Sequence, residues 1–194
     1  YSNHYKKLKE KHSELCRINA VNRQLAINED ANYLRSLGDV FITEPKNAGK
    51  LMRRSKETTV NSRGRLNKKK RFGRSIKNRC PSGFQTAVEE KFKTTGGTYI
   101  EVPNDYRASQ YDHTADEYIK KKLSDRMYRL ADGTLVQRDW YSSFLLYCYD
   151  YRTKNIDRDR CISEFKKCYS KEEALIKRIK INRIKVLNSG IKIA

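Results

Sequence analysis

Two short apolar segments with a helical pattern between them constrain the fold of this chain more than any other feature. Residues 39–45 contain the β-branched and aromatic run 40–42 and end at Pro45, which predicts a buried strand. The apolar pattern of residues 98–102 predicts a second strand. Residues 81–92 predict a helix, because their apolar side chains recur on one helical face. Because a helix that connects two strands is typical of a βαβ unit, the sequence predicts an α/β fold.

Four further segments have helical patterns. Residues 5–18 repeat apolar side chains at helical spacing among lysines, and residues 28–37 form a second helical stretch that stops before Gly38. Residues 139–151 are apolar on most sides. Residues 170–187 are basic and begin with a Ser-x-x-Glu pattern, which predicts a capped helix near the carboxyl terminus.

Residues 50–79 concentrate the positive charge of the molecule. They contain thirteen Lys or Arg residues and one acidic residue, Glu57, so this segment carries +12 of the net charge of +20. Clustered Lys and Arg favour binding to a phosphate backbone, because binding releases condensed counterions. Phe72 and the tyrosines of residues 106–128 are candidate stacking surfaces for bases. A solvated loop or a localisation signal is the alternative interpretation of such a run.

The composition excludes several classes of protein. The strong positive charge argues against a neutral metabolic enzyme, and the longest apolar stretch, residues 144–149, is far shorter than the roughly 20 residues that span a bilayer. The five cysteines are odd in number and none forms a C-x-x-C pair, which argues against a disulfide framework and against a zinc knuckle. With no apolar signal segment after Tyr1, we expect a reducing, cytoplasmic and bacterial-type location, at the nucleoid when the protein is bound to DNA.

Two carboxylates occupy positions that are typical of ligand sites in α/β proteins. Glu44 ends the first predicted strand, and Asp139 begins the apolar helix. A helix start favours the charged form of a carboxylate, which is the form that binds a divalent metal. The alternative is that Glu44 only ends a strand in solvent and that Asp139 is only a helix cap. Asp157 and Asp159 form a competing acidic pair, which we expect to lie in a solvated turn.

Several blocks of the sequence, in the same order along the chain, resemble the TnpB/OrfB family of transposon-associated, RuvC-like nucleases, which is related to the type V CRISPR effectors. The blocks are residues 38–47, Leu51, residues 53–56, 68–75, 108–114, 121–126 and 137–145. The resemblance extends over roughly residues 12–150, and an ordered series of blocks is more specific than any single motif.

The resemblance implies an RNase H-like core that is incomplete at the N-terminus, with a basic insertion and a C-terminal helical tail. It implies that Glu44 is the second catalytic acid and Asp139 the third, both as Mg²⁺ ligands, whereas the first acid lies on a strand that we expect before Tyr1. The intact protein would be an RNA-guided DNA endonuclease that uses magnesium, with DNA and a guide RNA as partners and no membrane partner. The present chain is expected to be inactive alone. The alternative is a non-catalytic basic nucleic-acid-binding fragment or a decayed transposase remnant.

The resemblance also divides the chain. It predicts a partial RuvC-like core at 1–103 with the basic segment 46–79, an insertion at 104–133, the last RuvC-like motif at 134–152 and a basic tail at 153–194. The insertion takes the position of the family's zinc-finger domain but has no cysteine and only His113, so we expect no zinc site and a structural or nucleic-acid-contacting histidine. The side chains predicted to contact nucleic acid are Arg53, Arg54, Lys68, Lys69, Lys70, Arg71, Arg74, Lys120, Lys121, Lys122, Arg126 and Arg138.

Overall fold

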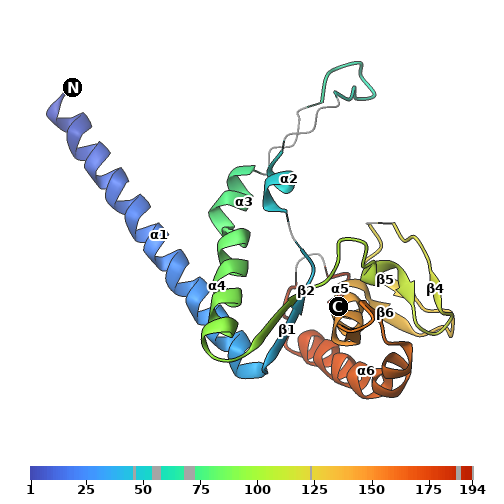
Figure 1. Cartoon of the computed structure of the whole chain (residues 1–194). Helices are drawn as coiled ribbons and strands as arrows, with labels where there is room; N and C mark the ends of the chain where they lie inside the picture. The colour runs from blue at the N-terminus through green and yellow to red at the C-terminus, as the bar shows by residue number, and fades with distance from the viewer. Residues whose placement is uncertain (46, 54–57, 68–72, 123, 187–188, 194) are drawn as a thin grey trace. The chain divides into compact units, whose positions relative to one another are not determined.

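The chain combines helices with short strands in two compact units (Figure 1). The computed structural model describes all residues except 46, 54–57, 68–72, 123, 187–188 and 194, and the side chains of 50, 51 and 74 are also outside the description. Unit 1 contains Tyr1–Phe41 and Lys46–Ile100, and unit 2 contains Ile42–Pro45 and Glu101–Ala194. In the described part of the chain, no helix has both the length and the apolar character needed to cross a membrane.

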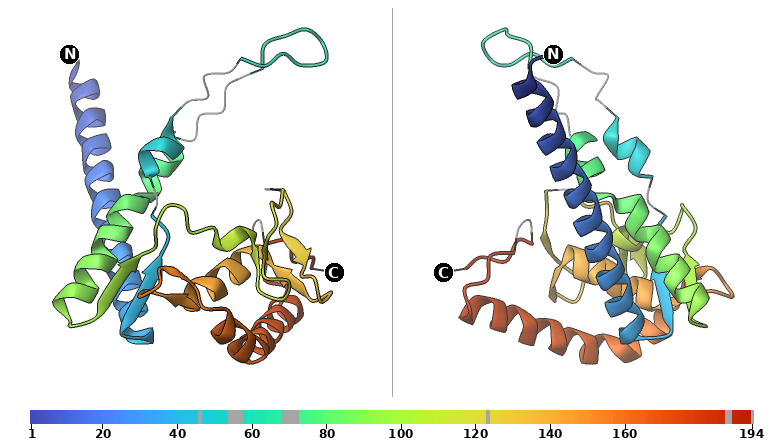
Figure 2. Two further views of the ribbon diagram at one scale, coloured as in Figure 1. Left: turned by 45° about the vertical axis from the view of Figure 1, so that its right-hand side comes forward. Right: turned by 90° about the vertical axis from the view of Figure 1, so that its left-hand side faces the viewer.

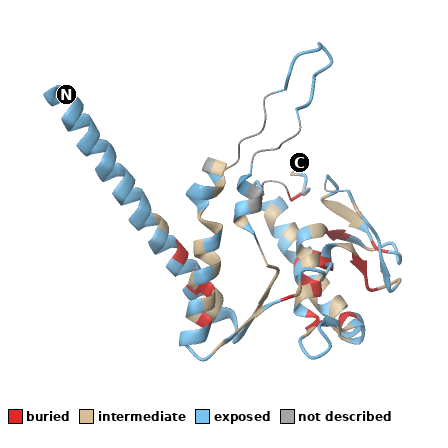
Figure 3. Cartoon of the chain, turned by 45° about the horizontal axis from the view of Figure 1, so that its top comes forward, coloured by how far each residue is buried: buried red, intermediate tan, exposed pale blue. Residues whose placement is uncertain are grey.

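Unit 1 begins with one long helix, α1 (Asn3–Leu37). The Ser2 side chain accepts a hydrogen bond from the Tyr5 amide at 3.2 Å and caps its start, and Gly38 follows its end. The sequence predicted two helices here, and this prediction was wrong because residues 19–27 contain no proline or glycine that would interrupt them. Most of α1 is exposed, and its buried residues, Ile27 and Ala31, lie near its carboxyl end (Figure 3).

The expected βαβ arrangement is present in strands β1 (Val40–Thr43) and β2 (Thr98–Glu101). The Thr98 amide donates to the Asp39 carbonyl, and the Val102 amide donates to the Thr43 carbonyl. Moving four residues along one strand moves the partner four residues in the same direction along the other, so the two strands are parallel. The prediction that β1 is buried was wrong, because among the described residues its sheet has two strands and leaves β1 partly exposed. Val40 is 57% exposed.

In the part of the connection between β1 and β2 that the structure describes, the helices are α2 (Ala48–Met52), α3 (Gly73–Arg79) and α4 (Pro81–Thr94). The carboxyl-terminal part of α1 runs alongside α4 in both views of Figure 2. Ala31 of α1 packs there with Val88 and Phe92 of α4, and this small cluster is extended by half-buried residues that include Phe41 and Tyr99. The two strands therefore join the core of unit 1 through their aromatic side chains.

Beyond the ends of β1 and β2, the described residues of unit 2 form three antiparallel hairpins, one 3₁₀ turn and two helices. The hairpins pair β3 (Tyr111–Asp112) with β4 (Glu117–Tyr118), β5 (Met127–Arg129) with β6 (Leu135–Gln137), and β7 (Tyr149–Asp150) with β8 (Asn155–Ile156). The 3₁₀ turn η1 (Ala108–Gln110) precedes β3. The helices are α5 (Arg138–Tyr147) and α6 (Arg158–Ile181).

One core serves the predicted insertion, the last predicted motif and the tail. It joins buried side chains of residues 108–130 with Tyr141, Leu145 and Cys148 of the α5 region and with Cys161 of α6. The sequence indicated few apolar anchors in residues 104–133, but Ala108, Tyr111 and Leu130 are all buried. These apolar residues form no helical or strand periodicity in the sequence, because each lies in a different short hairpin or turn. The pattern therefore did not predict their burial.

The helix α6 differs from its prediction in both bounds. Its start is set by Asp157, whose side chain accepts a hydrogen bond from the Arg160 amide at 2.9 Å. The predicted cap, Ser170, lies inside the helix, where its hydroxyl donates to the Lys167 carbonyl. Asp157 and Asp159 therefore begin a helix and do not lie in the solvated turn that the sequence indicated.

Candidate functional site

Asp139 lies in the first turn of α5, at the position that the sequence predicted. The Gln137 side chain caps this helix, since its Oε1 accepts a hydrogen bond from the Trp140 amide at 2.6 Å. The Asp139 side chain remains 61% exposed. The free amide groups of the first helical turn and the helix dipole both favour negative charge at this point. The fold therefore presents an accessible carboxylate at the amino end of a helix.

Two arginines surround this carboxylate. Arg138 approaches Oδ1 at 3.1 Å and Arg126 approaches Oδ2 at 3.9 Å, and Nε2 of Gln137 lies 3.4 Å from Oδ2. The Arg138 side chain is only 16% exposed, so packing holds its guanidinium in place. An exposed ion pair contributes little to stability, typically about 0–1 kcal/mol. The same guanidinium groups are well suited to hold a phosphate, because their donors match its oxygens.

Glu44 directly follows β1 and is half-buried. The Thr43 hydroxyl lies 3.4 Å from the Glu44 backbone carbonyl, which is a contact of the main chain and not of the carboxylate. The sequence placed Glu44 at the carboxyl end of a strand, and the structure does so too. Among the described residues, no hydrogen bond or ion pair links its carboxylate to Asp139.

The magnesium site implied by the family resemblance can be tested against the arrangement of acidic side chains. Glu44 and Asp139 are oxygen ligands of the type that Mg²⁺ prefers. In the part of the chain that the structure describes, however, no three His, Cys, Asp or Glu side chains gather where they could hold an ion. The described residues therefore do not form a complete metal site, and the pairing of Glu44 with Asp139 stays a prediction.

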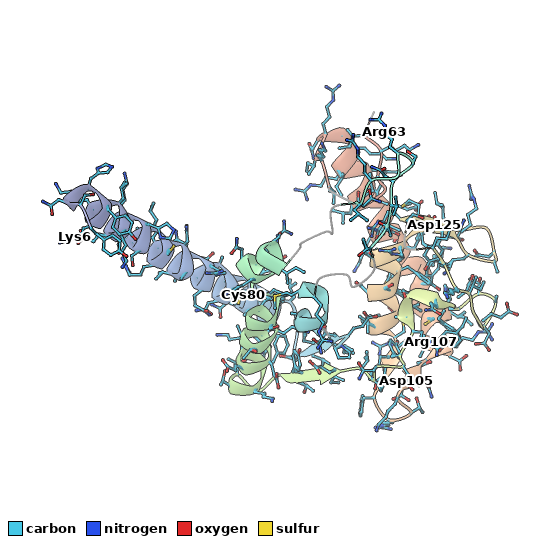
Figure 4. All side chains as sticks on the ribbon, turned by 90° about the horizontal axis from the view of Figure 1, so that it is seen from above. Lys6, Arg63, Cys80, Asp105, Arg107 and Asp125 are labelled. Atoms are coloured by element: carbon cyan, nitrogen blue, oxygen red, sulfur yellow. The ribbon has the colours of Figure 1, made fainter. Side chains whose placement is uncertain are left out.

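The basic segment 46–79 is described only in part. Arg54, Lys68, Lys69, Lys70 and Arg71 lie outside the described residues, as does the side chain of Arg74. Arg53 is exposed. Between α2 and α3, an isolated bridge joins Val60 to Leu66, and Figure 4 labels Arg63 on this turn. The described cations of the segment, Arg53, Arg63, Arg65, Lys77 and Arg79, are all exposed.

The three lysines at 120–122 do not have the same environment. Lys120 and Lys122 are exposed, but the ammonium group of Lys121 is buried and lies 3.4 Å from the centre of the Tyr128 ring. This position supplies a cation–π contact. Burial lowers the pKa of Lys121 to about 8, and the nearby Asp112 carboxylate partly opposes this effect. Lys121 is therefore a packing residue, which the sequence did not separate from its two neighbours.

Asp112 is the main residue that the sequence interpretation missed. It is 1% exposed, and its Oδ1 accepts hydrogen bonds from the amide and the hydroxyl of Thr114 while Oδ2 accepts one from the Ala131 amide. One carboxylate thus links the β3–β4 hairpin to the turn that follows β5. Burial alone would raise the pKa of Asp112, but these hydrogen bonds together outweigh it and hold the pKa below its ordinary value.

His113 is buried next to Asp112 and has a structural environment. Its Nδ1 lies 2.7 Å from the Tyr141 hydroxyl, and its ring packs on Phe165 with a centroid distance of 4.6 Å. Burial lowers the pKa of His113, so the neutral imidazole is favoured. Its backbone carbonyl accepts a hydrogen bond from Arg158 Nε at 3.1 Å. Of the two roles left open by the sequence, the structural one fits this burial.

Glu172 is a second buried acid, on the inner side of α6. It is 4% exposed, and neither carboxylate oxygen has a hydrogen bond of good geometry among the described residues. Burial raises the pKa of Glu172 to about 7, although the backbone of Gln137 partly favours the charged form. The sequence held a signal for this burial, because Glu172 occupies the helical face of Cys161, Phe165 and Cys168.

No protein-family model matches this chain, and no curated protein is significantly similar to it.

Proposed function

We propose that this chain is the nucleic-acid-binding part of a TnpB-like nuclease with an RNase H-like core, in which Glu44 and Asp139 serve phosphodiester cleavage. The observation that carries the proposal is the exposed Asp139 carboxylate at the start of α5, with the guanidinium groups of Arg138 and Arg126 beside it. An acid that remains accessible between two cations is suited to a site where a phosphate and a metal meet, because the arginines offset the charge of the phosphate.

The order of elements supports the same proposal. A parallel strand pair with Glu44 directly after its first strand precedes a helix that begins with Asp139. Two-metal hydrolysis needs several carboxylates around ions that are about 3.5–4 Å apart. Because the described residues offer no group of three ligands, we assign no step to the metal and propose Glu44 and Asp139 only as two of its ligands. DNA, a guide RNA and Mg²⁺ are the partners that this proposal requires.

A second candidate function is binding without catalysis. Both carboxylate oxygens of Asp139 already have cationic or amide neighbours, and a structural ion-pair network would produce the same contacts. A basic module that only binds nucleic acid also fits the net charge of +20.

The two functions differ in what Glu44→Gln and Asp139→Asn do. In a protein that joins this chain to the strand expected before it, each variant should lower Mg²⁺-dependent cleavage of plasmid DNA by about 100-fold or more, since each removes a metal-binding charge. Both variants should keep the nucleic-acid affinity of the parent, because the basic residues are unchanged. Cleavage is measured on agarose gels and binding by fluorescence anisotropy.

Asp105→Asn is the matched control, because Asp105 is exposed on the loop that follows β2 (Figure 4). It removes the same charge and should leave cleavage unchanged. Full cleavage by the Glu44 or Asp139 variant would contradict the catalytic assignment. Salt-sensitive binding by a parent protein that never cleaves would establish the second candidate instead.

A further inference from the structure

The helix α6 has two faces of different character. Its inner face packs into the core of unit 2 through Cys161, Phe165, Cys168 and Tyr169, and in Figure 1 this helix lies against α5. These residues recur at intervals of three and four, so they share one side of the helix. The opposite side is exposed, and its charged residues are the subject of the inference.

The exposed side is strongly basic from Lys166 to the end of the helix. The exposed charged residues of the stretch 165–181 are Lys166, Lys167, Lys171, Lys177, Arg178, Lys180 and one acid, Glu173. Lys167 lies 3.9 Å from Glu164, and the other five cations have no ion pair with any described residue. The stretch from Lys166 to Lys180 spans about 21 Å at the helical rise of 1.5 Å per residue. Glu172, the other acid in the sequence of the stretch 165–181, points into the protein.

A duplex of DNA carries one negative charge per about 1.7 Å of its axis, so a row of cations of this length faces many phosphates. We propose that the exposed face of α6 is a phosphate-backbone-binding surface for nucleic acid, separate from the basic segment 50–79. This inference rests on the proposed function, because it names a second surface for the same class of partner. Because these five cations have no ion pair with a described residue, they can neutralise phosphates without first breaking an ion pair within the protein.

An anionic membrane is the other polyanion that a basic helix can meet. Membrane-surface helices insert an apolar face opposite their cations. In α6 that face is already packed in the core through Phe165 and Cys168. The apolar side chains of α6 that stay exposed, Ile162, Leu175 and Ile181, lie on different sides of the helix. The helix therefore offers charge without a continuous apolar face to insert, which favours a nucleic acid over a lipid surface.

The test compares two triple variants of the full 194-residue chain. The first is Lys171→Ala, Lys177→Ala, Arg178→Ala, all on exposed positions of α6 where alanine keeps the helix. The second is Lys6→Ala, Lys9→Ala, Lys11→Ala, on the exposed amino-terminal part of α1, where Figure 4 labels Lys6. Both remove three positive charges from a helix. Circular dichroism checks that helicity is kept, and anisotropy with a labelled 20-base-pair DNA duplex measures Kd from 50 to 300 mM salt.

We expect the α6 variant to bind more weakly and to lose about 2 to 3 units from the slope of log K against log salt, since each phosphate contact contributes about 0.9. The conservative variant Lys171→Arg, Lys177→Arg should keep the slope of the parent. Equal losses in the α6 and α1 variants would show a net-charge effect and overturn the inference, as would parent-like binding by the α6 variant. Loss of binding to phosphatidylserine vesicles with unchanged DNA binding would also overturn it. A parent chain that binds no nucleic acid would instead contradict the proposed function itself.

Discussion

A single buried carboxylate, that of Asp112, connects two parts of unit 2 that are separated in sequence. Its oxygens accept hydrogen bonds from Thr114 in its own hairpin and from Ala131 in the next one. Hydrogen bonds to a charged acceptor, each contributing about 1.5–3 kcal/mol, therefore supply a cross-link between these two hairpins.

Asp112→Asn should lower the free energy of unfolding by about 2–4 kcal/mol at pH 7. The amide group replaces one acceptor oxygen by a donor, which leaves a buried partner such as the Ala131 amide without its hydrogen bond. Chemical denaturation followed by circular dichroism measures the change. The exposed Asp105→Asn is the control and should change stability by less than about 0.5 kcal/mol.

The pH dependence of this cross-link has a definite sign. Because the pKa of Asp112 is lower in the folded than in the unfolded protein, its contribution is present above the ordinary carboxyl pKa and is lost as the pH falls through the folded value. Denaturation curves of the parent and of Asp112→Asn should therefore converge toward acid pH. A constant difference between them from pH 7 to pH 2 would show that the lost charge is not responsible.

At the scale of the element, α6 shows how one helix divides its side chains between a core and a charged surface. Its inner side carries Phe165 and Cys161, and Glu172 lies on that same side. A carboxyl in this position is favoured in its neutral form, because burial penalises the charged form. The helix thus contains a group that opposes folding when it ionises.

The buried carboxyl of Glu172 should make the free energy of unfolding fall as the pH rises. Its pKa is raised from 4.5 to about 7 on folding, so the native state binds the extra proton, and the stability fully present below pH 4.5 is lost as the pH rises through 7. Glu172→Gln should therefore stabilise the chain at pH 8, by up to about 3 kcal/mol, and change it little at pH 4.5.

Glu173→Gln is the matched control for this titration, because Glu173 is the next residue and is exposed. It should keep most of the pH dependence of the parent, because burial is the main cause of the raised pKa of Glu172 and the Glu173 charge is a smaller one. Thermal unfolding at several pH values between 4.5 and 8.5 measures both variants. A profile for Glu172→Gln that runs parallel to that of the parent would contradict the role of this carboxyl.

At the scale of the whole molecule, positive charge and folded core are concentrated in different segments. Residues 50–79 carry +12 of the net +20, and their described cations are exposed. Among the described residues, the two cores, around Phe92 in unit 1 and around Tyr141 in unit 2, use other segments. Removal of charge from the basic segment should therefore change binding more than it changes folding.

The chain should bind DNA or RNA without marked sequence preference, with a slope of log K against log salt of about −4 to −5 if roughly six phosphates are neutralised. Replacement of Lys68, Lys69, Lys70 and Arg71 by alanine should reduce this slope and leave the unfolding midpoint unchanged. Anisotropy titrations at several salt concentrations measure the first effect and thermal unfolding the second. An unchanged slope in this variant would exclude these residues from the interface.

The sequence by itself determined the features that depend on neighbours along the chain. Helical spacing identified α4 and most of α1, and β-branched and aromatic residues identified β1 and β2. The same local patterns placed Glu44 at the end of a strand and Asp139 at the start of a helix. The hydrogen bonds within a helix and the side-chain periods of helices and strands extend over about four residues, so these features can be predicted from short stretches of sequence.

Only the tertiary structure decided the partners of individual side chains. The contact of Asp112 with Ala131, the position of Lys121 over Tyr128 and the approach of Arg126 to Asp139 each join residues that local patterns do not relate. The burial of Glu172 was also decided there, because the sequence shows which side of a helix a residue occupies but not whether another segment covers that side. Such partners depend on which segments pack together, because burial and hydrogen-bond satisfaction are properties of the folded surroundings and not of the residue.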